Sequence, residues 1–175
     1  MDRAIKSLRA KSLSNFDIMR ICNGKVNIVT YPELSEYSSI DDVLGKYGAA
    51  IILYLTKKKY GHWVAIFKVN RHQIEFFDPY GLRPDDQLDF INQHFRVENN
   101  EKKPHLSYLL YNSPYTVTYN DDRLQKMIKD VSTCGRWCAI RIVMRKLKLP
   151  DFVRIFKNNK CYDPDFFVTA ISSFI

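Results

Sequence analysis

The sequence predicts an α+β fold in which a central mixed β-sheet is packed by helices. Three observations lead to this prediction. Segments typical of strands are concentrated in the middle of the chain, whereas segments with helical periodicity lie toward both ends. The 175 residues are 46% hydrophobic and 14% aromatic, which is enough to bury a sizeable core. No repeat or low-complexity linker interrupts the chain, so we expect one domain over residues 1–175.

Segments rich in β-branched and aromatic residues predict the strands. They lie at residues 25–31, 49–56, 62–69, 73–79, 105–111 and 115–120. The run from 49 to 56 is apolar almost throughout, which is typical of a strand buried on both faces. Only Asn70-Arg71-His72 separates the strands at 62–69 and 73–79, so these two are expected to form a hairpin.

Capping residues and apolar periodicity predict the helices. They are expected from Ser14 or Asn15 to Gly24, within 39–48, and over 84–95, 134–145, 151–159 and 164–175. In the second of these, Ser39 and Asp42 have the spacing of a capping box. The helix at 84–95 is expected to begin at Pro84, which suits the first turn.

The charge and the termini limit the partners and the compartment. A formal net charge of +8 fits either a generally basic surface or an anionic partner such as DNA. Basic residues cluster at Lys57-Lys58-Lys59 and over 145–160, without a nucleic-acid-binding motif. The N-terminus lacks the apolar stretch of a signal peptide, and no apolar run approaches the roughly 20 residues that cross a bilayer. We therefore expect an intracellular monomer with no membrane partner, whose four cysteines are thiols.

His62 is the strongest candidate for acid–base chemistry. It begins a strand beside Trp63, and the partner strand ends in Asp78. If Val69 pairs with Arg71 across the turn, His62 lies directly opposite Asp78. A register shifted by two residues keeps both side chains on one face, and a shift of one separates them. A carboxylate on one imidazole nitrogen would support an imidazolium, although two unrelated surface groups are the alternative.

Cys134 has the setting of a nucleophile. It follows the N-cap candidates Ser132 and Thr133, so we expect it to be exposed at the positive end of the helix dipole, where an imidazolium would favour the thiolate. Gly135 is expected to leave space for a substrate backbone and to keep N–H groups clear for an oxyanion. Cys138, one turn further, is expected in the core. A zinc site lacks further ligands at suitable spacing, and a helix start without chemistry stays open.

Three ordered segments resemble one family of enzymes. "GHWVAIFKV", "IEFFDPYG" and "STCGRW" resemble the adenain and ubiquitin-like-protein protease superfamily of cysteine peptidases, which contains adenovirus maturation protease and SUMO proteases. The resemblance covers residues 49–145 and implies a cysteine-peptidase fold with the nucleophile at the N-terminus of a buried helix. It implies Cys134 as nucleophile, His62 as general base and acid, and Asp78 as the group that orients His62. Trp63 would line a narrow channel that admits small residues before the cleaved bond.

The resemblance also implies a side-chain oxyanion donor and a reaction. Gln125 is the candidate donor, although it lies farther from Cys134 than the family places its glutamine, so Asn120 is the alternative. No cofactor or metal is expected. The implied activity is that of an endopeptidase, either a viral enzyme that cuts precursor proteins after small residues such as Gly, in the host cell or the virion, or an enzyme that removes ubiquitin or a SUMO-type modifier. An inactive protein-binding module on the same fold is the third reading.

Overall fold

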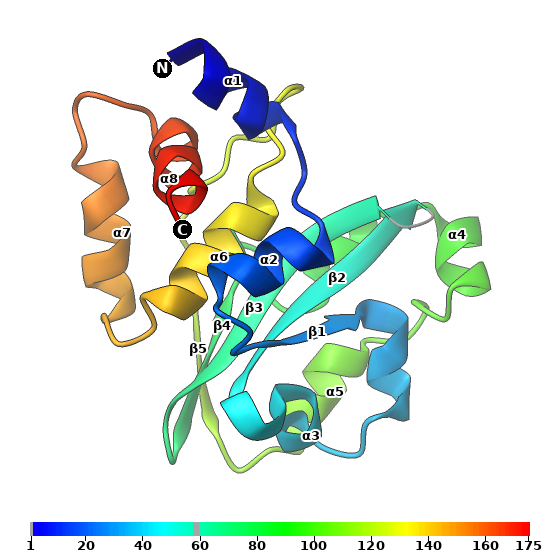
Figure 1. Cartoon of the computed structure of the whole chain (residues 1–175). Coiled ribbons are helices and arrows are strands. Elements are labelled where there is room, and N and C mark those ends of the chain that lie inside the picture. Colours follow the sequence, from blue (N-terminus) through cyan, green and yellow to red (C-terminus); the bar gives the residue numbers. More distant parts are fainter. Residues whose placement is uncertain (1, 58–59) are drawn as a thin grey trace.

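The computed structural model describes residues 2–57 and 60–175, and its centre is a five-stranded sheet in the order β1-β2-β3-β4-β5 (Figure 1). The strands are β1 (Asn27–Thr30), β2 (Ala49–Lys57), β3 (Tyr60–Asn70), β4 (Gln73–Phe77) and β5 (Thr116–Tyr119). The central pairs β2–β3 and β3–β4 are antiparallel, and β1 and β5 join the two edges in parallel. The predicted α+β class with a mixed sheet is confirmed.

Strand β2 is apolar along most of its length because both of its faces are covered. The side chains of Ala49, Ile51 and Leu53 belong to the hydrophobic core on one face of the sheet. Those of Ala50 and Ile52 belong to a second core on the opposite face. The prediction of a doubly buried strand is therefore confirmed, and the sheet separates two hydrophobic cores.

Helices cover both faces of the sheet (Figure 1). On one face lie α2 (Asn15–Ile21), α6 (Cys134–Val143), α7 (Leu149–Lys157) and α8 (Pro164–Ser173), with α1 (Asp2–Ala10) packed on α8. On the other lie the 3-10 helices η1 (Tyr31–Glu36) and η3 (Asp86–Phe90) and the helices α3 (Ile40–Leu44), α4 (Gln93–Glu98) and α5 (His105–Tyr111). The short η2 (Gly45–Tyr47) connects α3 to β2. Ser14 and Ser39 begin α2 and α3 with complete capping boxes, as the sequence predicts for Ser39.

The predicted strand at 105–111 is wrong, because this segment is helix α5. Leu106, Leu109 and Leu110 recur at the spacing of one helix face, and all three are buried in the core shared with η1 and α3. The aromatic residues of the segment favour a strand locally, but burial of this leucine stripe decides for the helix. Helix α1 forms in a segment for which no helix is predicted from the sequence.

The predicted helix at 84–95 is also wrong, since the chain forms η3 and α4 in its place. Asp85 has a φ of 71°, in the left-handed region. Its carboxylate accepts hydrogen bonds from the Tyr31 hydroxyl at 2.6 Å and the Ser107 amide at 2.7 Å. These contacts turn the chain away from a helical start, and the helix begins anew after Asn92, whose side chain caps α4.

Candidate active site

The hairpin of β3 and β4 brings His62 and Asp78 together. In the predicted register Ala65 would pair with Glu75, but in the structure it pairs with Phe77, two residues further along β4. Direct opposition of His62 and Asp78 is therefore wrong, but a shift of two residues keeps both side chains on one face. From this diagonal position, Nε2 of His62 lies 2.9 Å from Oδ1 of Asp78. The two residues are only 4% and 1% exposed, so the pair is shielded from water.

Electrostatics favour a charged imidazole in this site. Burial is the largest single effect and by itself would lower the pKa of His62, but the other effects together outweigh it. The charge and hydrogen bond of Asp78, followed by the hydrogen bond and charge of Cys134, raise the pKa of His62 to about 10. The imidazole is therefore protonated at neutral pH. Because Asp78 occupies Nε2, the other ring nitrogen is left for Cys134, and such a pair can stabilise a thiolate.

Cys134 is the first residue of α6, as the sequence predicts, but its predicted exposure is wrong. The residue is 7% exposed, and it shares a hydrophobic core with Leu13 and Trp63. The physical reason is that α6 is buried from Cys134 to Ile142, with the sheet on one side and α2 and α8 on others. Little of Cys134 is therefore in contact with solvent.

The start of α6 is fixed by Asp165 of α8 instead of by an N-cap side chain. Thr133 occupies the N-cap position, but its hydroxyl donates to Oδ1 of Asp165 and caps no backbone amide of the helix. The indole Nε1 of Trp137 donates to the same oxygen at 3.0 Å. The predicted capping role of Thr133 is corrected, and the fully buried Asp165 is a structural residue that sequence reasoning missed.

Cys138 and Gly135 both serve packing. Cys138 is fully buried, its thiol donates to the Trp63 carbonyl at 3.2 Å, and burial raises its pKa well above the ordinary value. Its predicted place in the core is confirmed. Gly135 does not leave open space for a substrate. A Cβ there would lie 3.2 Å from Cδ1 of Trp63 and 3.3 Å from Cβ of Leu13, so the missing side chain makes room for the indole.

The two candidate oxyanion donors differ in how their amides are used. Asn120 is fully buried and donates to the carbonyls of Asp78 at 2.7 Å and Asp122 at 2.9 Å. Both of its N–H groups are thus engaged in fixing the backbone of the hairpin end. Gln125 is 1% exposed, and its amide donates to the Tyr80 hydroxyl at 3.2 Å and to the Val131 carbonyl at 3.5 Å. Its Oε1 has no hydrogen-bond partner in the described part of the chain. Of the two, only Gln125 joins the surroundings of His62.

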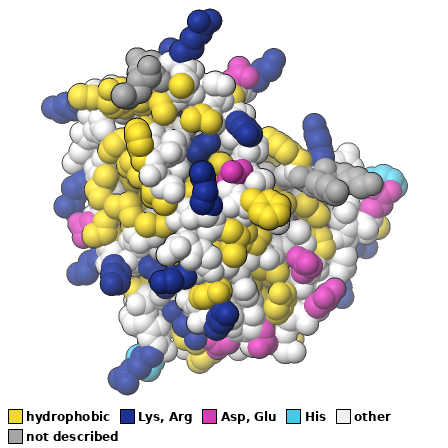
Figure 2. All heavy atoms as spheres, viewed as in Figure 1, with side chains coloured by type: hydrophobic (Ala, Val, Ile, Leu, Met, Phe, Trp, Pro, Cys, Tyr) yellow, Lys and Arg dark blue, Asp and Glu magenta, His cyan; other side chains and the backbone are white. Residues whose placement is uncertain are grey.

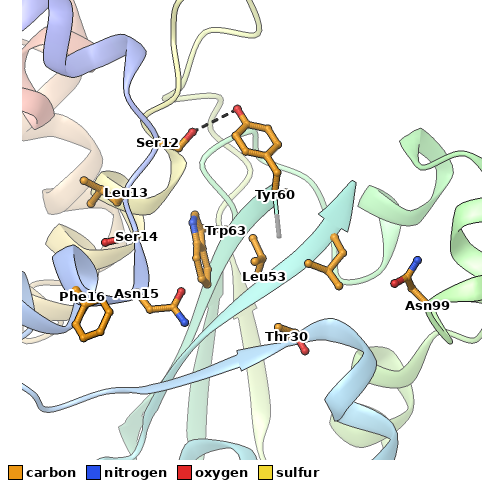
Figure 3. Close-up of a pocket in the computed structure, with 12 residues that line it drawn as sticks. Ser12, Leu13, Ser14, Asn15, Phe16, Thr30, Leu53, Tyr60, Trp63 and Asn99 are labelled. Carbon is orange, nitrogen blue, oxygen red and sulfur yellow. Dashed lines mark hydrogen bonds between the residues drawn. The ribbon is translucent and has the colours of Figure 1, made fainter. Parts of the chain in front are cut away.

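A groove of about 740 Å³ leads to Trp63, which the sequence predicts to line a channel (Figure 3). Its walls come from the segment before and within α2, the ends of β1 and β2, the start of β3, and Asn99. They are Ser12, Leu13, Ser14, Asn15, Phe16, Thr30, Leu53, Leu55, Tyr60, Gly61, Trp63 and Asn99. Figure 3 shows the Trp63 ring between Leu13 and Leu53, with the Tyr60 hydroxyl reaching toward Ser12. No charged side chain is among the described walls, so the groove suits an uncharged segment.

The N-terminal segment, which the sequence left without a predicted role, is attached to the loop before Cys134 and to α6. The amide of Ser132 donates to the Arg9 carbonyl at 2.9 Å. The guanidinium of Arg136 donates to the Leu8 carbonyl at 3.2 Å and to the Ser172 hydroxyl at 2.8 Å. The chain on both sides of Cys134 is therefore held by residues that precede α2.

The predicted basic clusters are only partly visible as surface features. Two residues of the Lys57-Lys58-Lys59 cluster, 58 and 59, lie outside the described residues. Two cations of segment 145–160 form ion pairs, Arg154 with Asp151 and Lys157 with Asp122. On the face drawn in Figure 2, Lys and Arg side chains are scattered among hydrophobic and uncharged ones.

The four cysteines are free thiols, and Cys161 alone among them is exposed. Within residues 2–57 and 60–175, no group of three or more His, Cys, Asp or Glu side chains could hold a metal ion. Across these same residues, none of the helices combines the length and apolarity that a membrane crossing requires. The side chains gathered at the site are a thiol, an imidazole, a carboxylate and an amide.

Comparison with known proteins places the chain among viral proteins. No family model matches the chain. It is 41% identical over 173 residues to uncharacterized protein V9 of Sputnik virophage, an alignment that covers 97% of this chain and 99% of the relative. The similarity thus includes the terminal helices, which the peptidase resemblance does not reach. At this identity and coverage, the chain belongs to the family of Sputnik virophage protein V9.

Proposed function

We propose that this viral protein is a cysteine endopeptidase with Cys134 as nucleophile, His62 as general base and acid, and Asp78 as the group that orients His62. The observation that carries the proposal is the buried contact between His62 and Asp78 at 2.9 Å, beside Cys134, which also raises the pKa of His62. The thiol begins α6, so the helix dipole adds to the stabilisation of a thiolate.

In the proposed reaction, the Cys134 thiolate attacks the carbonyl carbon of a peptide bond, and the carbonyl oxygen becomes an oxyanion. The Cys134 amide and the Gln125 side chain are the proposed oxyanion donors. Collapse of the tetrahedral intermediate breaks the C–N bond, and the leaving amine takes the proton of His62. Water then attacks the thioester, His62 accepts a proton from it, and the acid product leaves with restoration of the thiolate–imidazolium pair.

The surroundings of Cys134 support a substrate with small residues at the cleaved bond. Since Cys134 is 7% exposed and Trp63 is 5% exposed, a large side chain beside the scissile carbonyl would have to displace packed core residues. The uncharged groove beyond Trp63 fits an extended polypeptide segment. A viral precursor protein is the proposed substrate, cut in the infected cell or in the virion by a monomeric enzyme.

The test compares two classes of electrophilic probe on the purified protein. Peptides that end in Gly-Gly or Gly-Ala electrophiles represent a precursor, and full ubiquitin or SUMO with a C-terminal electrophile represents a modifier. We expect the peptide probes to modify Cys134, detected by mass spectrometry, and Cys134→Ala to abolish both modification and peptide hydrolysis. Labelling by the modifiers alone would instead indicate a deconjugating enzyme.

Cys138→Ala is the matched control, since it removes a neighbouring thiol from the same helix. Cys138 is fully buried and bonded to the Trp63 carbonyl, so this variant should lose stability but keep most of the activity. If neither probe class labels Cys134 in the folded wild-type protein, the endopeptidase proposal is wrong, and a binding module on this fold becomes the better reading.

A further inference from the structure

Tyr80 contacts three groups of the site at once, although no role is predicted for it from the sequence. Its ring is stacked on the His62 imidazole, with ring centroids 4.3 Å apart and an interplanar angle of 10°. Its backbone N–H donates to Oδ1 of Asp78 at 2.7 Å. Its hydroxyl accepts a hydrogen bond from the Gln125 amide at 3.2 Å.

The backbone contact fixes the carboxylate. Oδ1 of Asp78 accepts from both the Tyr80 amide and the His62 ring, whereas Oδ2 has no partner in the described part of the chain. A carboxylate held by two donors on one oxygen cannot rotate without losing both bonds. The Tyr80 backbone therefore sets the direction from which Asp78 meets the imidazole.

The ring contact fixes the imidazole. A parallel aromatic ring over one face of His62 restricts rotation of the imidazole and excludes water from that face. Burial, followed by the charges of Cys134 and Asp78, raises the pKa of the Tyr80 phenol above its ordinary value. The phenol therefore stays neutral, and its oxygen remains available as the acceptor for Gln125.

We infer that Tyr80 is a positioning residue that holds His62 in line with Cys134 through its ring and ties Gln125 to the same unit through its hydroxyl. The inference rests on the proposed peptidase function for its catalytic meaning. It also gives Gln125 a place in the site despite its unusual distance from Cys134 along the sequence, because the amide is anchored through Tyr80.

Two substitutions separate the ring from the hydroxyl. Tyr80→Phe keeps the stack and removes the contact with Gln125, whereas Tyr80→Leu removes both. Tyr119→Leu is the matched control, because Tyr119 is also half-buried but packs edge-on against Phe76 instead of His62. All proteins carry Cys161→Ser, so that the exposed Cys161 thiol does not react.

The first readout is the rate of Cys134 alkylation by iodoacetamide between pH 5 and 10, which requires no peptidase activity. The titratable groups around this contact are Asp78, Cys134, Asp165 and Tyr60. Tyr80→Leu should shift the alkylation profile toward the higher pH of a free thiol, because the imidazolium is no longer held beside Cys134. Tyr80→Phe and Tyr119→Leu should keep the wild-type profile. An unchanged profile in Tyr80→Leu would overturn the inference.

The second readout is peptide hydrolysis by the same variants. Tyr80→Phe should lower kcat about fivefold with little change in KM, the size expected for one lost hydrogen bond. In a Gln125→Ala background, the same substitution should have almost no further effect, because its partner is already absent. Full additivity of the two substitutions would refute the link through the hydroxyl. Absence of hydrolysis in the wild type would refute the peptidase function, while the alkylation profiles would still decide the role of the ring.

Discussion

At the scale of single residues, His62 links the chemistry of the site to the stability of the fold. The imidazole is buried, yet Asp78 and Cys134 make its charged form the favoured one. A charge that is buried and paired stabilises the folded chain only in the pH range where the group is charged. The same ion pair that would prepare Cys134 for reaction therefore makes folding dependent on pH.

The expected pH dependence follows from the raised pKa of His62. The pKa is about 10 in the folded chain and near 6.5 for a free imidazole, so the stabilisation is complete below about pH 6.5 and is lost as the pH rises through about 10. The free energy of unfolding of the wild type, relative to His62→Gln, should fall by roughly 4 kcal/mol between pH 6 and pH 10.5. Urea unfolding at several pH values measures this difference.

The buried thiols of Cys22 and Cys138 do not disturb that comparison. Burial raises the pKa of Cys22 to about 12 and that of Cys138 well above its ordinary value, so both groups weaken the fold at alkaline pH. They are present in both proteins, and their contribution cancels. A difference between wild type and His62→Gln that does not change with pH would show that His62 is neutral in the folded chain.

At the scale of elements, a buried ion pair fastens α6 to β4. The Arg141 guanidinium donates to both oxygens of Glu75, at 2.7 and 2.8 Å. It also donates to the carbonyls of Met144 and Leu147, which close the turn after α6. Arg141 is 1% exposed and Glu75 is 3% exposed, so the ion pair itself is shielded from water. The pair sets how α6, which begins with Cys134, lies on the strand that leads to Asp78.

Replacing both residues of this pair should destabilise the protein less than the two single replacements added together. Arg141→Met leaves the Glu75 carboxylate buried and unpaired, and Glu75→Leu leaves the Arg141 guanidinium buried and unpaired. Each substitution should lower the free energy of unfolding by about 3 to 5 kcal/mol. The double variant should be less destabilised than the sum of the two, since no unpaired charge remains. Thermal and urea unfolding of the wild type, the two single variants and the double variant measure the coupling free energy between the two residues. Simple additivity would mean that the pair does not act as a unit.

At the scale of the whole molecule, the two ends of the chain converge on α6. Helix α1 packs on α8, and the Arg9 side chain pairs with Asp163 at the start of α8. From there Asp165 bonds to Thr133, and Arg136 reaches back to the Leu8 carbonyl. The terminal helices, which lie outside the peptidase resemblance, thus support the residues around Cys134.

Removal of residues 2–10 tests this support. The truncated chain should keep its sheet and remain folded by circular dichroism, but its melting temperature should fall by about 5 °C and its Cys134 should react more slowly. The cause is the loss of the Leu8 and Arg9 carbonyls that hold Arg136 and Ser132. Removal of residues 174–175, the first of which is 82% exposed, is the control and should change neither quantity. Equal effects of both truncations would contradict a specific role of α1.

Local chemistry explains which parts of the molecule could be predicted. Ser39 with Asp42 identifies the start of α3, and the apolar run of β2 identifies a strand between two cores. The hairpin places His62 and Asp78 on one face of the sheet because side chains along a strand point to alternate faces with a period of two residues. Each of these predictions needs only neighbouring residues and a fixed backbone period.

Contacts between distant segments explain what could not be predicted. The strand expected at 105–111 is helix α5 because its leucine stripe meets a core that distant residues complete. The prediction that Cys134 is exposed is wrong because α2 and α8 pack against α6. Gly61 is required because a Cβ there would lie 1.7 Å from the Tyr54 carbonyl of the adjacent strand.

The sequence by itself determined the α+β class, the main strands and helices, and the choice of Cys134, His62 and Asp78 as candidates, because those depend on periodicity, caps and hairpin parity. The tertiary structure alone decided the register of the hairpin, the burial of the thiol, the packing role of Gly135 and the junction formed by Tyr80. These features depend on side chains that meet only after the chain has folded, and no local pattern records which of them will meet.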